Sequence, residues 1–195
     1  NVKGRLDLTR VLPNGSKVFI DFAHTPNAIE NAISSLSAHF QKKITIIFGC
    51  GGQRDKKKRK LMGKIANSLC NKIYITDDNP RNENPKKIRQ SILKFIDSKK
   101  AIEIGDRSKA IYHSLINSNP NEIILVAGKG HEALQDYGKK TIKVSDYQIV
   151  KNVKIKGKKI SIKNLDFLEN RKTINNLLKK NIKKGYLGVS INIPF

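Results

Sequence analysis

Short apolar segments alternate with amphipathic segments along the first 152 residues, and this alternation restricts the fold more than any other feature. Residues 44–48 and 122–127 are largely apolar runs, which are typical of strands buried on both faces of a parallel sheet. Further strands are predicted at 72–76, 101–104 and 140–144, and helices at 25–39, 58–69, 85–95 and 106–116, with a closing helix that begins at Ser145. The pattern predicts a Rossmann-like, doubly wound α/β sheet that is mostly parallel.

The N-terminal segment departs from this alternation. Residues 6–12 and 17–22 flank Pro13-Asn14-Gly15, which is a turn sequence. We therefore predict an antiparallel hairpin at the start of the domain.

The composition changes after residue 152. Residues 153–195 are dominated by Lys, Asn and Ile, and we divide the chain into a domain at 1–152 and a basic appendage at 153–195, either an extension or the truncated start of another domain. Ile174, Leu177, Leu178 and Ile182 have the spacing of an amphipathic helix. Because Asn1 is neither an initiator Met nor the start of a signal peptide, we expect a piece of a longer protein.

The chain carries 39 Lys and Arg against 16 Asp and Glu, a formal net charge of +23. A nucleic-acid or anionic-membrane partner would explain this charge, and so would a compositional bias towards Lys, Asn and Ile. We favour the bias, with no nucleic-acid or membrane partner, because the basic residues are spread along the chain without a nucleic-acid-binding motif. Cys50 and Cys70 have no metal-ligand spacing, which fits free thiols in the cytoplasm and no metal site.

The predicted strands lead into loops that combine Gly or Pro with charged side chains. These loops are Asp-Phe-Ala-His-Thr-Pro at 21–26, Gly-Cys-Gly-Gly-Gln-Arg-Asp at 49–55, Asp-Asp-Asn-Pro-Arg at 77–81 and Gly-Lys-Gly-His-Glu at 128–132. Ligands of such sheets bind beyond the carboxyl ends of the strands, so all four loops should gather at one edge. Each loop alone could be an ordinary turn. The glycines at 49–52 are no P-loop, a single histidine is more often structural, and the basic run 56–60 could simply face solvent.

Together, in this order over about 110 residues, the four motifs resemble the C-terminal domain of the Mur ligases. The resemblance covers residues 4–152, and Thr76 to Arg81 resembles the marker of the members that add meso-diaminopimelate. It implies one domain of an ATP-dependent, amide-forming ligase that adds meso-diaminopimelate to UDP-N-acetylmuramoyl-L-alanyl-D-glutamate in cytoplasmic peptidoglycan synthesis. ATP and Mg²⁺ would be held mainly by a central domain that this chain lacks, so the chain alone should be inactive.

The chemistry of meso-diaminopimelate suits these residues. Its distal carboxylate calls for planar cations, which Arg54 and Arg81 supply. Glu132 and the backbone around Gly128 would bind the distal ammonium, with Asn79 bridging the two groups. The amino-acid site is completed by Asp78 and Pro80.

By resemblance, a second set of residues would face the nucleotide: His24, Asp55 and Lys58. A solvent-facing Lys58 remains an alternative. Phe22 stands where the family usually has Tyr, which removes a hydroxyl and any hydrogen bond that it makes.

Two other functions stay open from the sequence. Another Mur or folylpolyglutamate-type ligase domain would share the fold but should not carry both 78–81 and 128–132. A basic nucleic-acid-binding module would explain the charge and leave the loop motifs unexplained. In the appendage, Gly188-Val189-Ser190-Ile191 resembles the start of another Mur ligase, so a fusion, an ordinary extension and a reading-frame artefact all remain possible.

Overall fold

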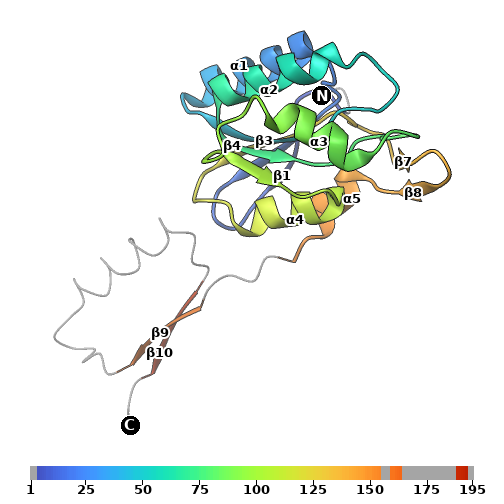
Figure 1. Ribbon diagram of the computed structural model, residues 1–195. Coiled ribbons are helices and arrows are strands. Elements are labelled where there is room, and N and C mark those ends of the chain that lie inside the picture. The colour runs from blue at the N-terminus through green and yellow to red at the C-terminus, as the bar shows by residue number, and fades with distance from the viewer. Residues whose placement is uncertain (1–3, 155–158, 164–187, 193–195) are drawn as a thin grey trace.

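A computed structural model describes residues 4–154, 159–163 and 188–192 of the chain. Its main sheet has six strands in the order β1-β2-β6-β3-β4-β5, and all neighbouring pairs are parallel except β1 with β2 (Figure 1). The strands are β1 (Asp7–Val11), β2 (Lys17–Asp21), β3 (Ile44–Phe48), β4 (Cys70–Ile75), β5 (Ala101–Glu103) and β6 (Ile123–Ala127). The predicted fold class and the N-terminal hairpin are both confirmed.

Helices cover both faces of this sheet. They are α1 (Pro26–Phe40), α2 (Lys57–Leu69), α3 (Pro85–Leu93), α4 (Arg107–Ile116) and α5 (Asp146–Asn152). Apolar residues of α1, α2 and α3 share one core cluster with Ile46 and Phe48, whereas α4 and α5 share the other with Ile47. Successive side chains of a strand point to opposite faces, so one buried strand such as β3 serves both cores.

The helix starts follow from local sequence. Thr25, Asn84, Asp106 and Ser145 are N-caps, and each side chain accepts a hydrogen bond from a backbone N–H of the first turn. Pro26 and Pro85 follow two of these caps at a position where a missing N–H costs nothing. The caps predicted at Asp106 and Ser145 are therefore confirmed.

The strand predicted at residues 140–144 is confirmed, but it does not belong to the main sheet. Residues Thr141–Lys143 form β8, which pairs antiparallel with β7 (Leu134–Asp136) in a separate two-stranded sheet. The turn between them is fixed by the Asp136 carboxylate, which accepts a hydrogen bond from Gly138 N at 2.7 Å, and Gly138 has a φ of 73°. This local Asp-x-Gly turn returns the chain onto β7 before it can reach the sheet edge.

Two further strands lie in the basic appendage. β9 (Lys159–Lys163) and β10 (Gly188–Asn192) pair in parallel and form a sheet of their own. The residues Gly188 to Ile191 that suggested a second ligase lie in β10. The predicted amphipathic helix over Ile174 to Ile182 lies outside the described residues, and the domain boundary at 152 stays a prediction.

Candidate functional site

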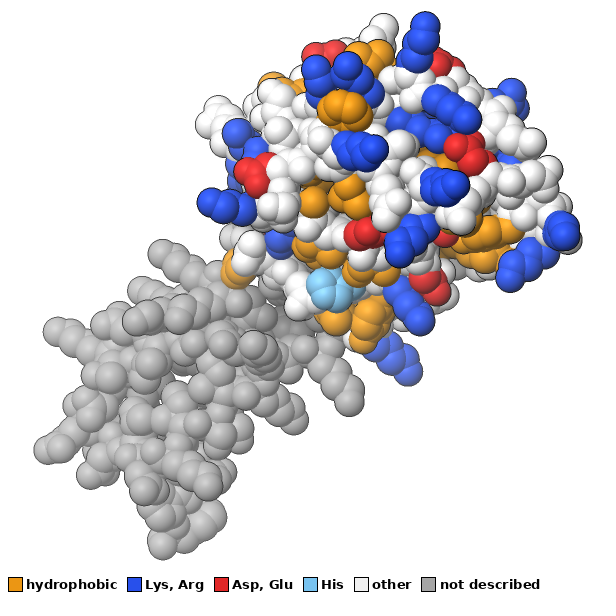
Figure 2. All heavy atoms as spheres, viewed as in Figure 1, with side chains coloured by type: hydrophobic (Ala, Val, Ile, Leu, Met, Phe, Trp, Pro, Cys, Tyr) orange, Lys and Arg blue, Asp and Glu red, His pale blue; other side chains and the backbone are white. Residues whose placement is uncertain are grey.

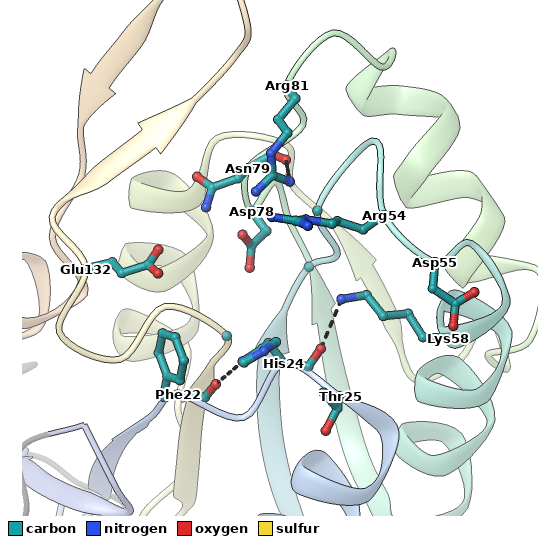
Figure 3. A pocket seen from close by; sticks show the side chains of 13 residues that line it. Phe22, His24, Thr25, Arg54, Asp55, Lys58, Asp78, Asn79, Arg81 and Glu132 are labelled. Atoms are coloured by element: carbon teal, nitrogen blue, oxygen red, sulfur yellow. Dashed lines mark hydrogen bonds between the residues drawn. The ribbon is translucent and has the colours of Figure 1, made fainter.

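The loops that follow β2, β3, β4 and β6 meet around one pocket of about 450 Å³ (Figure 3). The predicted gathering of the four motifs at the carboxyl edge of the sheet is therefore observed. Nine of the predicted site residues line this pocket, together with Phe22, Thr25, Gly49 and Gly51: they are His24, Arg54, Asp55, Lys58, Asp78, Asn79, Arg81, Gly128 and Glu132. Pro80 is buried and does not line it.

The glycines of 49–52 allow two loops to pack against each other. A Cβ on Gly52 would lie 1.8 Å from the Pro80 carbonyl oxygen, and one on Gly49 would lie 2.3 Å from the Thr76 carbonyl oxygen. Gly52 N also donates to the Asn79 carbonyl at 2.9 Å. Gly49 and Gly52 thus do more than form a turn, because a side chain on either would separate the loops that carry the two pocket arginines.

Arg81 is held by its backbone and by two nitrogens of its side chain. Its φ of 52° lies in the left-handed region, and its N–H donates to the Asp136 carbonyl at 2.9 Å. Nη1 donates to the Gly52 carbonyl at 2.8 Å, and Nε lies 3.8 Å from a carboxylate oxygen of Asp136. An unfavourable backbone conformation that several contacts maintain is common where a side chain must be aimed at a ligand.

The two adjacent acids of the third loop have different surroundings. Asp77 accepts hydrogen bonds from Arg89 and from the Tyr137 hydroxyl, the latter at 3.0 Å. Burial raises the pKa of Tyr137, and the nearby Asp77 carboxylate raises it further, so this hydroxyl stays a donor. Asp78 lines the pocket instead, and a Cβ on Gly128 would lie 2.9 Å from its Oδ2. Gly128, with a φ of 113°, thus leaves room for the Asp78 carboxylate.

Glu132 supplies a second carboxylate, from the loop after β6. Its side chain is 40% exposed, and its Oε2 lies 3.4 Å from Nζ of Lys129, which is fully buried. In Figure 3, Glu132 lies on one side of the pocket and Arg54 extends from the other, with Asp78 drawn between them and Arg81 above.

The predicted nucleotide-side residues lie at the other end of the lining. Lys58 Nζ donates to the His24 carbonyl at 3.1 Å, and Asp55 accepts a hydrogen bond from Lys57 N at the start of α2. The Phe22 ring packs edge-on against His24, with centroids 4.8 Å apart, and stacks on His131 at 5.9 Å. A phenyl ring is therefore accommodated where the family usually has Tyr.

Sequence reasoning missed two buried arginines that support the pocket. Arg59, within the basic run 56–60, forms a two-point ion pair with Glu83 at 2.7 and 2.8 Å and donates to the Gly51 carbonyl. Arg107 pairs with Asp146 at 2.8 and 2.7 Å and donates to the carbonyl of Ala127, the residue before Gly128. Both side chains lie on the buried face of a helix, so part of the basic run points inward.

The cations of the molecule differ in how they are neutralised. Arg59, Arg89 and Arg107 each have a carboxylate within 2.7 Å. Among the described residues, by contrast, Arg54 and Lys58 have no acidic partner within 4 Å, although both line the pocket. With Asp78 and Glu132 in the same lining, the pocket offers charges of both signs, which suits a ligand that carries both ammonium and carboxylate groups.

Other functional classes find less support in the described part of the chain. No cluster of three or more His, Cys, Asp or Glu residues there could hold a metal ion. The thiols of Cys50 and Cys70 are buried and free, and burial raises the pKa of each to about 12. Neither thiol is therefore a ready nucleophile at neutral pH.

Comparisons with known proteins agree on one family. The model of the family described as "Mur ligase, glutamate ligase domain" matches residues 4–130. The chain is 49% identical over 150 residues to UDP-N-acetylmuramoyl-L-alanyl-D-glutamate–2,6-diaminopimelate ligase of Rickettsia bellii, covering 76% of this chain and 31% of that relative. A solved structure of a ligase with the same name superposes with a TM-score of 0.71 at 32% identity, covering 78% of this chain and 31% of that one.

A more distant structure supports the fold alone. Folylpolyglutamate synthase of Mycobacterium tuberculosis, solved with ADP, superposes with a TM-score of 0.54 at 18% identity, covering 66% of this chain and 30% of that one. The chain therefore spans about a third of the length of the proteins that it matches.

Proposed function

Because the chain belongs to the Mur ligase family, as its glutamate ligase domain, we propose that it is the amino-acid-binding domain of the ligase that adds meso-diaminopimelate to UDP-N-acetylmuramoyl-L-alanyl-D-glutamate. The observation that best supports this proposal is the lining of the pocket. It places the cations of Arg54 and Arg81 and the carboxylates of Asp78 and Glu132 in one lining.

The charges of this pocket match the distal end of meso-diaminopimelate. Arg81 and Arg54 would bind the distal carboxylate, while Glu132 and Asp78 would bind the distal ammonium. Asn79 would bridge the two groups through its amide nitrogen, since its Oδ1 accepts a hydrogen bond from Asp136 N at 3.0 Å. Lysine lacks the distal carboxylate and would leave Arg54 without an acidic partner, which disfavours it strongly.

The domain contributes to catalysis by positioning. With the distal end held, the amine at the other end of the amino acid is directed out of the pocket towards the acceptor, and a bimolecular reaction gains from that orientation. ATP, when bound, supplies the phosphoryl group that activates the acceptor carboxylate. Closure of the domain over the nucleotide would exclude water from the activated group.

Lys58 fits the nucleotide side of such a site. Lys58 lines the pocket, and among the described residues its Nζ donates a hydrogen bond only to the His24 carbonyl. Its charge can therefore face phosphate oxygens. His24 and Asp55 lie in the same lining. We assign the main ATP and Mg²⁺ contacts to the central domain that the resemblance implies, and we place the reaction in the cytoplasm, where both thiols stay reduced.

Replacing Arg81 tests this proposal. In the 195-residue chain, Arg81→Ala should weaken meso-diaminopimelate binding by about 2–5 kcal/mol, because the distal carboxylate loses one of its two arginine partners. NMR titration or calorimetry measures the affinity directly.

The matched control is Arg10→Ala. Arg10 also donates to backbone carbonyls, those of Val150, Lys151 and Val153, and it lies beside Val18 at the opposite end of the sheet. Its loss should leave the affinity unchanged. Equal affinities of wild type and Arg81→Ala, or an equal loss in Arg10→Ala, would contradict the assignment.

A further inference from the structure

Lys129 is a charged side chain that is fully buried behind the pocket. Its Nζ donates to the Leu134 carbonyl and to Oε2 of Glu132, the latter at 3.4 Å. Glu132 is its only carboxylate partner among the described residues, and Lys129 itself does not line the pocket. Burying an ammonium is unfavourable, and an apolar side chain would fill the same space at no such cost. We therefore expect the buried ammonium of Lys129 to have a role other than filling space in the core.

The hydrogen bonds of Lys129 continue towards Arg81. Leu134 is the first residue of β7, and Asp136 is the last. The Asp136 carbonyl accepts a hydrogen bond from Arg81 N at 2.9 Å, and Asp136 N donates to the Asn79 side chain at 3.0 Å. A strand of three residues thus links Lys129 to the loop that carries Arg81.

Glu132 and the loop that carries Arg81 are in this way connected through one path. It runs from Glu132 through Lys129 and β7 to Arg81. The Tyr137 hydroxyl, just after β7, adds a bond to Asp77 at 3.0 Å and holds the hairpin against the same loop. The path consists of three hydrogen bonds, Glu132–Lys129, Lys129–Leu134 and Arg81–Asp136, joined by the backbone of β7. It ends at the backbone N–H of Arg81, so it restricts the position of Glu132 relative to the loop that carries Arg81.

We propose that Lys129 is a positioning residue that sets the spacing between Glu132 and Arg81, and that this spacing selects an amino acid whose far end carries an ammonium and a carboxylate on the same carbon. The inference rests on the proposed function. Without Lys129, Glu132 loses its orienting partner, and β7 loses a contact to the loop after β6. The distal ammonium of the ligand can then no longer contact Glu132 while the distal carboxylate contacts Arg81.

The test compares two ligands on the 195-residue chain. Lys129→Met keeps an unbranched side chain that is one atom shorter, and it removes both hydrogen bonds. NMR titration gives the affinities of meso-diaminopimelate and of L-lysine, which lacks the distal carboxylate. We expect the affinity for meso-diaminopimelate, and its ratio to that of lysine, to fall about tenfold or more. A purely structural role would not change the ratio, because both ligands bind the same folded population.

The matched control is Lys143→Met, which removes an exposed lysine from β8 of the same hairpin and should leave both affinities unchanged. If Lys129→Met does not fold, Lys129→Gln provides the test, since its amide keeps a donor and should give an intermediate ratio. An unchanged ratio in either folded variant overturns the inference alone. A wild-type chain that does not prefer meso-diaminopimelate over lysine overturns the proposed function, and the inference with it.

Discussion

Glu83 links the stability of the glycine loop to pH. Its carboxylate accepts two hydrogen bonds from Arg59 and a third from Gln53 N at 3.2 Å, so it joins α2, the glycine loop and the segment before α3. The hydrogen bonds from Arg59 lower the pKa of Glu83 from 4.5 to about 2. A carboxylate whose pKa is lower in the folded state stabilises the fold above its unfolded pKa, and that contribution is lost as the pH falls.

The replacement Glu83→Gln should show this dependence. At neutral pH it should lower the free energy of unfolding by about 1–3 kcal/mol, because the buried Arg59 loses a charged partner. The difference from wild type should stay constant above about pH 4.5 and shrink as the pH falls through about 2, because Glu83 then becomes protonated in the folded state as well as in the unfolded state.

Urea unfolding of both proteins at several pH values measures the effect. Glu30→Gln, which removes an exposed carboxylate from α1, is the control and should not change the stability at any pH. A difference between Glu83→Gln and wild type that does not decrease in acid would contradict the role of this ion pair.

At the scale of elements, the glycine loop and the loop at 76–81 act as one unit. Gly52→Ala should destabilise the domain by about 1–3 kcal/mol, because its Cβ would meet backbone atoms of Pro80 that cannot move independently. Gly51→Ala should instead leave the stability nearly unchanged, since its Cβ would meet Nη1 of Arg81 at 2.9 Å, the far end of a flexible side chain.

The two variants therefore separate folding from binding. Gly51→Ala should lower the affinity for meso-diaminopimelate by displacing the guanidinium of Arg81 while its thermal unfolding temperature stays close to that of wild type. Thermal unfolding and NMR titration of the two variants test both halves of the prediction. A Gly51→Ala protein that unfolds as early as Gly52→Ala would show that the two glycines have the same role.

Most elements of the main sheet were predictable because the buried strands are continuous apolar runs and the helices begin at recognisable caps. The three-residue strand β5 was recognisable from its place in the alternation of strands and helices. A strand was predicted at the position of β8, but its partner β7 was not, since β7 has three residues and follows a loop rather than a helix. Asp136 of this hairpin holds Asn79 and Arg81 in place. The sequence therefore identified the two site residues but not the element that positions them.

The buried arginines were missed for a different reason. Composition alone places Arg59 in a run of solvated charges, yet Arg59, Met62, Gly63 and Ala66 have helical spacing and form the buried face of α2. Arg107 occupies the equivalent place before Ala110, Ile111 and Ser114 on α4. The helical periodicity was therefore the sequence signal that these arginines are buried. An arginine on the buried face of a helix can be accommodated there when a carboxylate partner lies nearby.

At the scale of the whole molecule, the charges of the pocket do not explain the net charge of +23. Figure 2 shows Lys and Arg side chains spread over the visible face of the domain, with acidic and apolar side chains between them. None of the described helices is long and apolar enough to cross a membrane. The interactions that shape the pocket are formed by a few residues at the carboxyl edge of the sheet, whereas most of the basic residues lie elsewhere.

Electrophoretic mobility shifts across salt concentrations test whether this charge has a partner. If the charge reflects composition, binding to generic DNA or RNA should be weak, independent of sequence and nearly absent at roughly 200 mM salt, because dispersed lysines release few counterions at any one contact. Excess meso-diaminopimelate should not change it, since the pocket is not involved. Tight binding that persists at this salt concentration would contradict the prediction and assign the basic residues to a nucleic-acid partner, while the Arg81 titration would still decide the function of the pocket.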